Sequence, residues 1–222
     1  ERDYLFEKLF YTEISKVSKK NEILKIGNNI ELSIFNKLNN INTSISKYFY
    51  GNSKIFFKKY GNYFWKIFID YIPFFDDGVK TRSGSISEIN VNEDKLYEII
   101  AVLNSDIFYH FYIISSDCRN ITSKDINKFI YNSESHISSK LASLGKILSK
   151  DVKSKSRIRT ENLKSGAIRK VEIFDRYKES KEIINNINCV LANLYKFTEE
   201  EIDFLNNYDI KYRMGKELEE EE

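Results

Sequence analysis

Apolar residues recur every three or four positions in several stretches of the chain, and this spacing is typical of helices with one buried face. The helices predicted in this way are Glu31 to Asn39, Glu93 to Asn104 and Lys181 to Tyr195. Capping boxes predict two more, because a threonine and an acidic residue three positions later can each bind the other's backbone N–H. One predicted helix follows Thr122 and runs to Phe129, and the other follows Thr198.

The stretch between the first two helices has a β-strand pattern instead. Two runs rich in aromatic and β-branched residues, Lys54 to Tyr60 and Tyr63 to Asp70, flank the dipeptide Gly61-Asn62. Glycine and asparagine tolerate the positive φ values of tight turns, so this arrangement predicts a β-hairpin. The small, polar residues Gly78 to Ser87 predict an exposed loop. The aromatic-rich segment Ile107 to Ile114 fits either a helix or a strand.

Together these elements predict an α+β fold. We expect a mixed β-sheet module with flanking helices over residues 1–132, then a basic, mostly helical module over residues 133–216. Residues 217–222 are predicted to be a disordered acidic tail. No repeat of solenoid period is visible.

The composition is that of a protein with a packed core, at 41% hydrophobic and 14% aromatic residues in a chain of 222. No apolar run approaches the ~20 residues that a membrane span needs, and no signal-peptide pattern is present. Cys118 and Cys189 form no metal-binding or redox spacing, which favours free thiols and a cytoplasmic location. The chain starts at Glu1 and its only methionine is Met214, so we expect a fragment or a processed product.

Positive charge is concentrated in one part of the chain. The net charge is +2, but five of the last six residues are glutamates, so residues 1–216 carry +7. The segment from Lys146 to Lys170 holds nine basic residues against Asp151 and Glu161. Such a segment is expected of a phosphate-binding surface, although a solvated helix face or a mobile loop has the same composition.

Catalytic motifs are scarce in the sequence. The chain has no glycine-rich phosphate loop and no HExxH, and His110, inside an aromatic run, is predicted to be a core residue. Asp76 and Asp77 precede a glycine and predict a turn rather than a metal site. Asp70, Glu88 and Lys95 are the residue types of a metal-dependent nuclease centre, but many unrelated sequences contain such a set. We therefore expect no catalytic centre in this chain.

Four segments occur in an order that suggests a family. They are Tyr63 to Lys66 followed by Pro73 to Phe75, Leu103 to Tyr109, Ser116 to Ile121, and the closing segment Thr198 to Gly215. In type and order they resemble the C-terminal region of type IIG restriction–modification enzymes and related adenine-specific DNA methyltransferases. Cys118 stands where we expect a glycine from this resemblance.

The resemblance implies a target-recognition domain that reads double-stranded DNA. In the family the catalytic half lies upstream, binds S-adenosylmethionine in a Rossmann-like domain and holds the target adenine with an Asn-Pro-Pro-aromatic motif. The single proline of this chain cannot supply that motif. The implied partners are therefore duplex DNA and an upstream methyltransferase domain, with S-adenosylmethionine as cofactor of the parent enzyme and no cofactor expected in this chain. The parent would be an adenine-specific DNA methyltransferase, with or without an endonuclease activity.

Candidate DNA contacts fall into four groups. Basic side chains suit phosphates, which set register, while Arg, Asn and other polar side chains on loops suit base edges, which carry the sequence information. The groups are Lys58, Lys59, Tyr60 and Asn62 at the hairpin tip; Lys80, Arg82 and Ser83 in the exposed loop; Asp117, Arg119 and Asn120 in the polar turn; and Lys153, Lys155, Arg157 and Arg159 in the basic segment.

Two other functions remain open at this stage. The helix Lys181 to Tyr195 could dock a partner in a restriction–modification complex, in the manner of a specificity subunit. A nuclease with a scattered acidic site is the third reading. Retention of DNA binding and metal-dependent cleavage are the properties that separate these three functions.

Overall fold

A computed structural model describes residue 13 and residues 18–19, 22–59, 67–163, 166–174 and 176–209. Its helices are α3 (Asn29–Asn39), η1 (Ile45–Tyr48), η3 (Glu93–Lys95), α4 (Leu96–Asn104), α5 (Asp106–Ser115), α6 (Ser123–Asn127), α7 (Ser135–Lys155), α8 (Arg176–Tyr195) and α9 (Glu199–Asn207). Its strands are β1 (Ser18–Lys19), β2 (Glu22–Ile23), β3 (Ser53–Lys58), β4 (Phe68–Ile69), β5 (Phe75–Asp76), β6 (Ile86–Val91), β7 (Arg157–Asn162) and β8 (Ile168–Ile173). The α+β fold class is confirmed.

A central antiparallel sheet has the strand order β4–β3–β6. Ile55, Phe56 and Phe57 are buried in succession along β3, so both faces of this strand are covered. Helix α4 is fastened to the outer strand by Asn104, whose side chain accepts a hydrogen bond from the Phe68 N–H at 3.1 Å and donates to its carbonyl oxygen at 2.8 Å. The amide thus satisfies backbone groups that an edge strand would otherwise leave unpaired.

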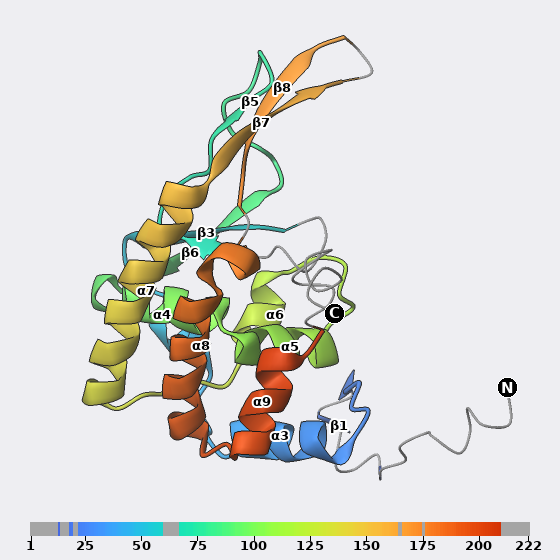
Figure 1. Ribbon diagram of the computed structural model, residues 1–222, viewed down its shortest axis with the longest axis vertical. Coiled ribbons are helices and arrows are strands. Elements are labelled where there is room, and N and C mark those ends of the chain that lie inside the picture. Colours follow the sequence, from blue (N-terminus) through green and yellow to red (C-terminus); the bar gives the residue numbers. More distant parts are fainter. Residues whose placement is uncertain are drawn as a thin grey trace, which may run out of the picture.

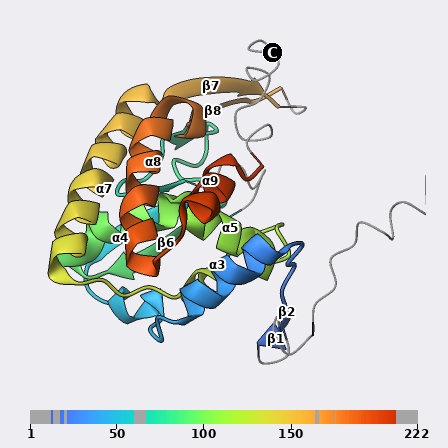
Figure 2. The same cartoon turned by 60° about the horizontal axis from the view of Figure 1, so that its bottom comes forward.

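The long helices α7 and α8 lie side by side, and α7 also packs against α4 (Figures 1 and 2). Side chains of these helices join the strands in a single hydrophobic cluster, which includes Ile99 of α4, Leu148 of α7 and Ile187 of α8. The domain boundary predicted near residue 132 lies between α6 and α7, and elements on both sides of it contribute to this core. Among the described helices, none combines the length and the apolar composition of a membrane-crossing segment.

Most of the predicted elements are confirmed. The predicted helices correspond to α3, to η3 with α4, and to α8, and both capping boxes form, at Thr122 and Thr198. The segment Ile107 to Ile114 is helical and belongs to α5. The two hairpin runs pair as β3 and β4, but their turn, with Tyr60 and Asn62, lies outside the described residues, as does the acidic tail.

Strands β6, β7 and β8 were not predicted. The loop was expected to end at Ser87. It ends at Ser85, because strand β6 begins at Ile86 and pairs with β3. The basic segment, for which we expected a helix face or a loop, continues past α7 as the antiparallel hairpin β7–β8. Alternating β-branched residues such as Ile158 and Thr160 favour this extended form. Gly166 makes the turn possible because its φ of +81° is readily adopted only by glycine.

Candidate nucleic-acid interface

The backbone of Lys59 joins three of the predicted contact groups. Its N–H donates to the carbonyl oxygen of Ser85 at 2.8 Å, and its carbonyl oxygen accepts from the N–H of Ile121 at 3.1 Å. Ser85 ends the loop that carries Lys80, Arg82 and Ser83, and Ile121 follows the turn that carries Asp117, Arg119 and Asn120. The end of β3, this loop and this turn therefore lie next to one another, although they are far apart in the sequence.

The loop between β5 and β6 begins with a turn built by two aspartates. The Asp76 carboxylate accepts the Gly78 N–H at 2.9 Å, and the Asp77 carboxylate accepts the N–H groups of Lys80 at 2.6 Å and Val79 at 3.0 Å. The bonds from Lys80 and Val79 lower the pKa of Asp77. The prediction of a turn at this position is confirmed, and the turn leaves the Lys80 side chain exposed.

Arg82 is exposed but already has a partner. Its guanidinium bonds the Glu88 carboxylate at 2.8 Å, and Lys54 bonds the same carboxylate at 2.5 Å. The hydrogen bonds from these two cations lower the pKa of Glu88, and the bond from Lys54 has the larger effect. The Arg82 guanidinium also lies 6.0 Å from the centre of the Phe56 ring. Arg82 is thus held close to the sheet, and only its remaining N–H groups are available to a ligand.

The polar turn after α5 is fixed by its own side chains. The Ser116 hydroxyl accepts the Cys118 N–H at 3.1 Å, and the Asp117 carboxylate accepts the Arg119 N–H at 3.0 Å. Cys118 has a φ of +61°, in the region that glycine favours. The side chains of Arg119 and Asn120 are exposed on this fixed backbone. One carboxylate oxygen of Asp117 accepts this hydrogen bond within the turn, so the predicted contact of Asp117 with a base would have to use its second oxygen.

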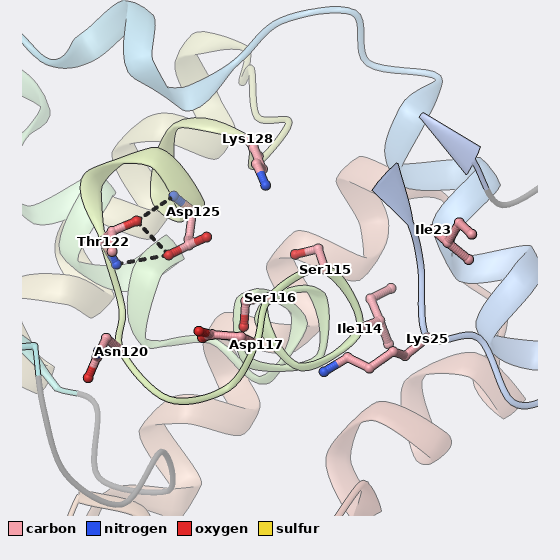
Figure 3. A pocket seen from close by; sticks show the side chains of 10 residues that line it. All are labelled: Ile23, Lys25, Ile114, Ser115, Ser116, Asp117, Asn120, Thr122, Asp125 and Lys128. Atoms are coloured by element: carbon pink, nitrogen blue, oxygen red, sulfur yellow. Dashed lines mark hydrogen bonds between the residues drawn. The ribbon is translucent and has the colours of Figure 1, made fainter. Parts of the chain in front are cut away.

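A pocket of about 520 Å³ opens beside this turn (Figure 3). Its lining residues are Ile23, Lys25, Ile114, Ser115, Ser116, Asp117, Asn120, Thr122, Asp125 and Lys128. Thr122 and Asp125 bind each other through a 2.6 Å hydrogen bond, as part of the capping box of α6. Two lysines and two aspartates balance the charge of the lining, so the pocket has no net attraction for an anion.

The fourth contact group lies at one end of the long axis of the molecule. Strands β7 and β8, with β5 beside them, extend beyond the helices (Figure 1). In this ribbon of β7 and β8, to which β5 adds a short third strand, alternate side chains point to opposite faces. The register places Arg157, Arg159, Glu161 and Arg169 on one face, and Lys170 and Glu172 on the other. The positive charge of the ribbon is therefore concentrated on one face.

Lys153 and Lys155 lie where α7 runs into β7, at the base of the ribbon. The Lys153 ammonium is 4.8 Å from the centre of the Tyr71 ring, a cation–π contact. Lys155 bonds the Asp151 carboxylate at 2.9 Å. Both side chains are nevertheless exposed and can reach a polyanion.

The described residues do not bring together the acids of a nuclease. Asp70 bonds Ser149 and Tyr97, Glu88 bonds Lys54 and Arg82, and Lys95 bonds Glu98 and Ser138. In the part of the chain that the structure describes, no group of histidine, cysteine and acidic side chains could hold a metal ion. His110 is fully buried, 3.4 Å from Glu31, and its predicted core position is confirmed.

The apolar side of α8 is used within the chain. Ile184, Ile187, Val190 and Leu191 are buried in the main hydrophobic cluster. A docking role for this helix would have to use its exposed polar side, which includes Cys189 and Asn193.

The contact residues named from the sequence leave out one residue of the basic ribbon face, although it lies within the predicted basic segment. Arg169 lies directly across from Glu161, but it is distant in sequence from Arg157 and Arg159. The signal that could have revealed it is the alternation of β-branched residues on both sides of Gly166.

Compared with protein-family models, with curated proteins and with solved structures, the chain matches none.

Proposed function

We propose that this chain is a sequence-specific recognition domain for double-stranded DNA, belonging to an adenine-specific DNA methyltransferase of the type IIG restriction–modification kind. The observation that carries the proposal is the meeting of three exposed polar segments at the backbone of Lys59. Sequence-specific readers place several loops on one side of a rigid scaffold, because a single loop spans too few base pairs.

The proposed roles follow from the chemistry of each segment. Arg119 and Asn120 are exposed on a fixed turn, and arginine and asparagine side chains can bond guanine and adenine edges with two hydrogen bonds each. Lys153 and Lys155 are exposed at the base of the ribbon and suit phosphate contacts. Methylation requires the adenine to leave the base stack, and in this proposal the methyltransferase part, outside this chain, performs that step with S-adenosylmethionine.

Binding of the 222-residue chain to duplex DNA at several salt concentrations tests the proposal. Each neutralised phosphate should contribute about −0.9 to the slope of log affinity against log salt concentration. A pool of duplexes with a randomised central segment, selected by binding and then sequenced, should converge on a defined site. An affinity that does not change with salt, or a bound pool as random as the input, would contradict the proposal.

A further inference from the structure

The basic face of the β7–β8 ribbon contains one acid, and this acid holds two arginines. The Glu161 carboxylate accepts hydrogen bonds from Arg159 through Nη2, and from Arg169 through Nε at 2.8 Å and through Nη2. The three side chains are partly or largely exposed: 58% of the Arg159 side chain, 38% of Arg169 and 21% of Glu161 are accessible.

This contact leaves one edge of the Arg169 guanidinium available. With Nε and one N–H of Nη2 directed to Glu161, the two N–H groups of Nη1 and the second N–H of Nη2 point away from the carboxylate. Parallel N–H groups on Nη1 and Nη2 match the N7 and O6 acceptors of guanine in the major groove. An arginine restrained in this way loses less side-chain entropy when it binds than a freely moving one.

The presence of a carboxylate on this face is not explained by attraction to phosphates alone. Glu161 weakens the pull of the ribbon on a polyanion, since it cancels one of the three arginine charges. If the ribbon only gripped the DNA backbone, an uncharged residue at position 161 would serve better. The acid instead restricts the direction in which Arg169 can donate hydrogen bonds, and direction matters for reading bases.

The dimensions of the hairpin also suit a groove. Beyond Lys170, where the pairing with β5 ends, the hairpin has two strands, and a two-stranded ribbon fits the major groove of B-form DNA, which is about 12 Å wide. Strands β7 and β8 extend beyond the helices, and β5 pairs with one edge of β8 near its middle (Figure 1). Glu172, on the opposite face, bonds Tyr71 at 3.0 Å and the Phe74 N–H at 2.8 Å, which ties the ribbon to the segment before β5.

We propose that the β7–β8 ribbon enters the major groove, that Arg169 bonds a guanine there, and that Glu161 is the residue that positions Arg169. This proposal rests on the proposed function, because it names a further reading element of the proposed DNA-recognition domain.

The variants E161Q and R169K test it in the full 222-residue chain. E161Q removes the negative charge and leaves a side chain of equal size, while R169K keeps the positive charge and loses the guanidinium. The matched control is K170A, which removes a basic residue from the other face of the same ribbon. Circular dichroism spectra and thermal unfolding compare the folds, and binding to the randomised duplex pool, followed by sequencing, measures the preference at each base position.

The proposal predicts opposite changes in affinity and in preference for E161Q. Its affinity for an arbitrary duplex should stay equal or increase, while its preference for guanine at one position should fall by about tenfold. R169K should lose the same preference with little change in salt dependence, and K170A should keep the wild-type preference.

Three other results would count against it in different ways. If E161Q binds all duplexes more tightly with an unchanged preference, Glu161 acts only through its charge and the inference is wrong. An unchanged preference in R169K likewise overturns the role of Arg169, while the proposed DNA-reading function survives. If the unmodified chain binds no duplex, the proposed function fails, and this inference fails with it.

Discussion

Gly145 of helix α7 lies directly against the backbone carbonyl oxygen of Tyr97 in helix α4. A Cβ atom at position 145 would come within 1.9 Å of that oxygen and within 3.2 Å of the Ala101 backbone nitrogen. The absence of a side chain therefore allows the two helices to approach closely. Because α7 continues directly into β7, the same contact helps to fix the direction in which the ribbon extends.

The variant G145A should be markedly less stable than the unmodified chain. Alanine is a better helix former than glycine by about 1 kcal/mol, but the clash involves backbone atoms, and overpacking of this kind costs about 1–3 kcal/mol or more. Urea denaturation measures the difference. G84A is the control, because a Cβ at Gly84 would meet nothing within 4 Å. Equal stability of the two variants would contradict the close approach of α4 and α7.

Glu98 is a fully buried acid with a complete set of donors. Its carboxylate accepts hydrogen bonds from Tyr131 and Ser133, each at 2.6 Å, from Lys95 at 2.8 Å, and from Ser138. Burial by itself raises the pKa of Glu98, but the bonds from Lys95 and the hydroxyl groups outweigh it and hold the pKa below its usual value. These contacts link α4 to the start of α7.

Stability should therefore fall in acid partly through Glu98. A carboxyl group whose pKa is lower in the folded state stabilises the fold above its unfolded value of about 4.3, and this contribution disappears as the pH falls through the folded-state pKa. E98Q should reduce the free energy of unfolding at pH 7 by about 1–3 kcal/mol, because the amide cannot accept all of these bonds. Unfolding curves from pH 7 to pH 3 should be flatter for E98Q. The exposed Glu182 supplies the control E182Q, and an identical acid dependence in E98Q and the unmodified chain would refute the assignment.

The two cysteines should respond in opposite ways to replacement by glycine. Cys118 has a φ of +61°, a conformation that costs a residue with a side chain about 1 kcal/mol, so C118G should leave the stability unchanged or raise it by up to about 1 kcal/mol. Cys189 is exposed within helix α8, where glycine should destabilise the fold by about 1 kcal/mol. Thermal unfolding of both variants under reducing conditions makes the comparison. A C118G variant less stable than C189G would show that the Cys118 side chain contributes more than its backbone conformation costs.

The elements that could be predicted from the sequence are those with a strong local signal. The helix spacing of Leu96, Ile99 and Leu103 and the capping boxes at Thr122 and Thr198 depend on neighbours within a few residues, and all three features are confirmed. The hairpin β7–β8 was not predicted, because its many charged residues obscure the alternation of its β-branched residues. Strand β7 is largely exposed and β8 is at most half-buried, so no continuous apolar stripe is needed on either face.

The candidate interface was predictable by residue type but not by arrangement. Loop residues such as Arg82 and Arg119 can be chosen from composition and turn chemistry. Their proximity depends on the hydrogen bonds of Lys59 to Ser85 and Ile121, which join positions far apart in the chain. Long-range pairing of this kind leaves no local pattern in a single sequence.

Arg119 offers the sharpest test of base reading outside the ribbon. Its backbone is fixed by Asp117 and by the bond between Ile121 and Lys59, while its side chain is exposed. An arginine on a rigid turn is suited to a directional contact, so R119A should weaken binding to the selected duplex by about 1–3 kcal/mol and bind other sequences nearly as before. Lys124, exposed on the neighbouring helix α6, gives the control K124A for the loss of one positive charge. Competition binding with the selected duplex and with a duplex of scrambled sequence separates the two effects. If R119A weakens binding to both duplexes equally and reduces the salt slope by about 0.9, Arg119 contacts a phosphate, and sequence reading must come from other residues of this surface.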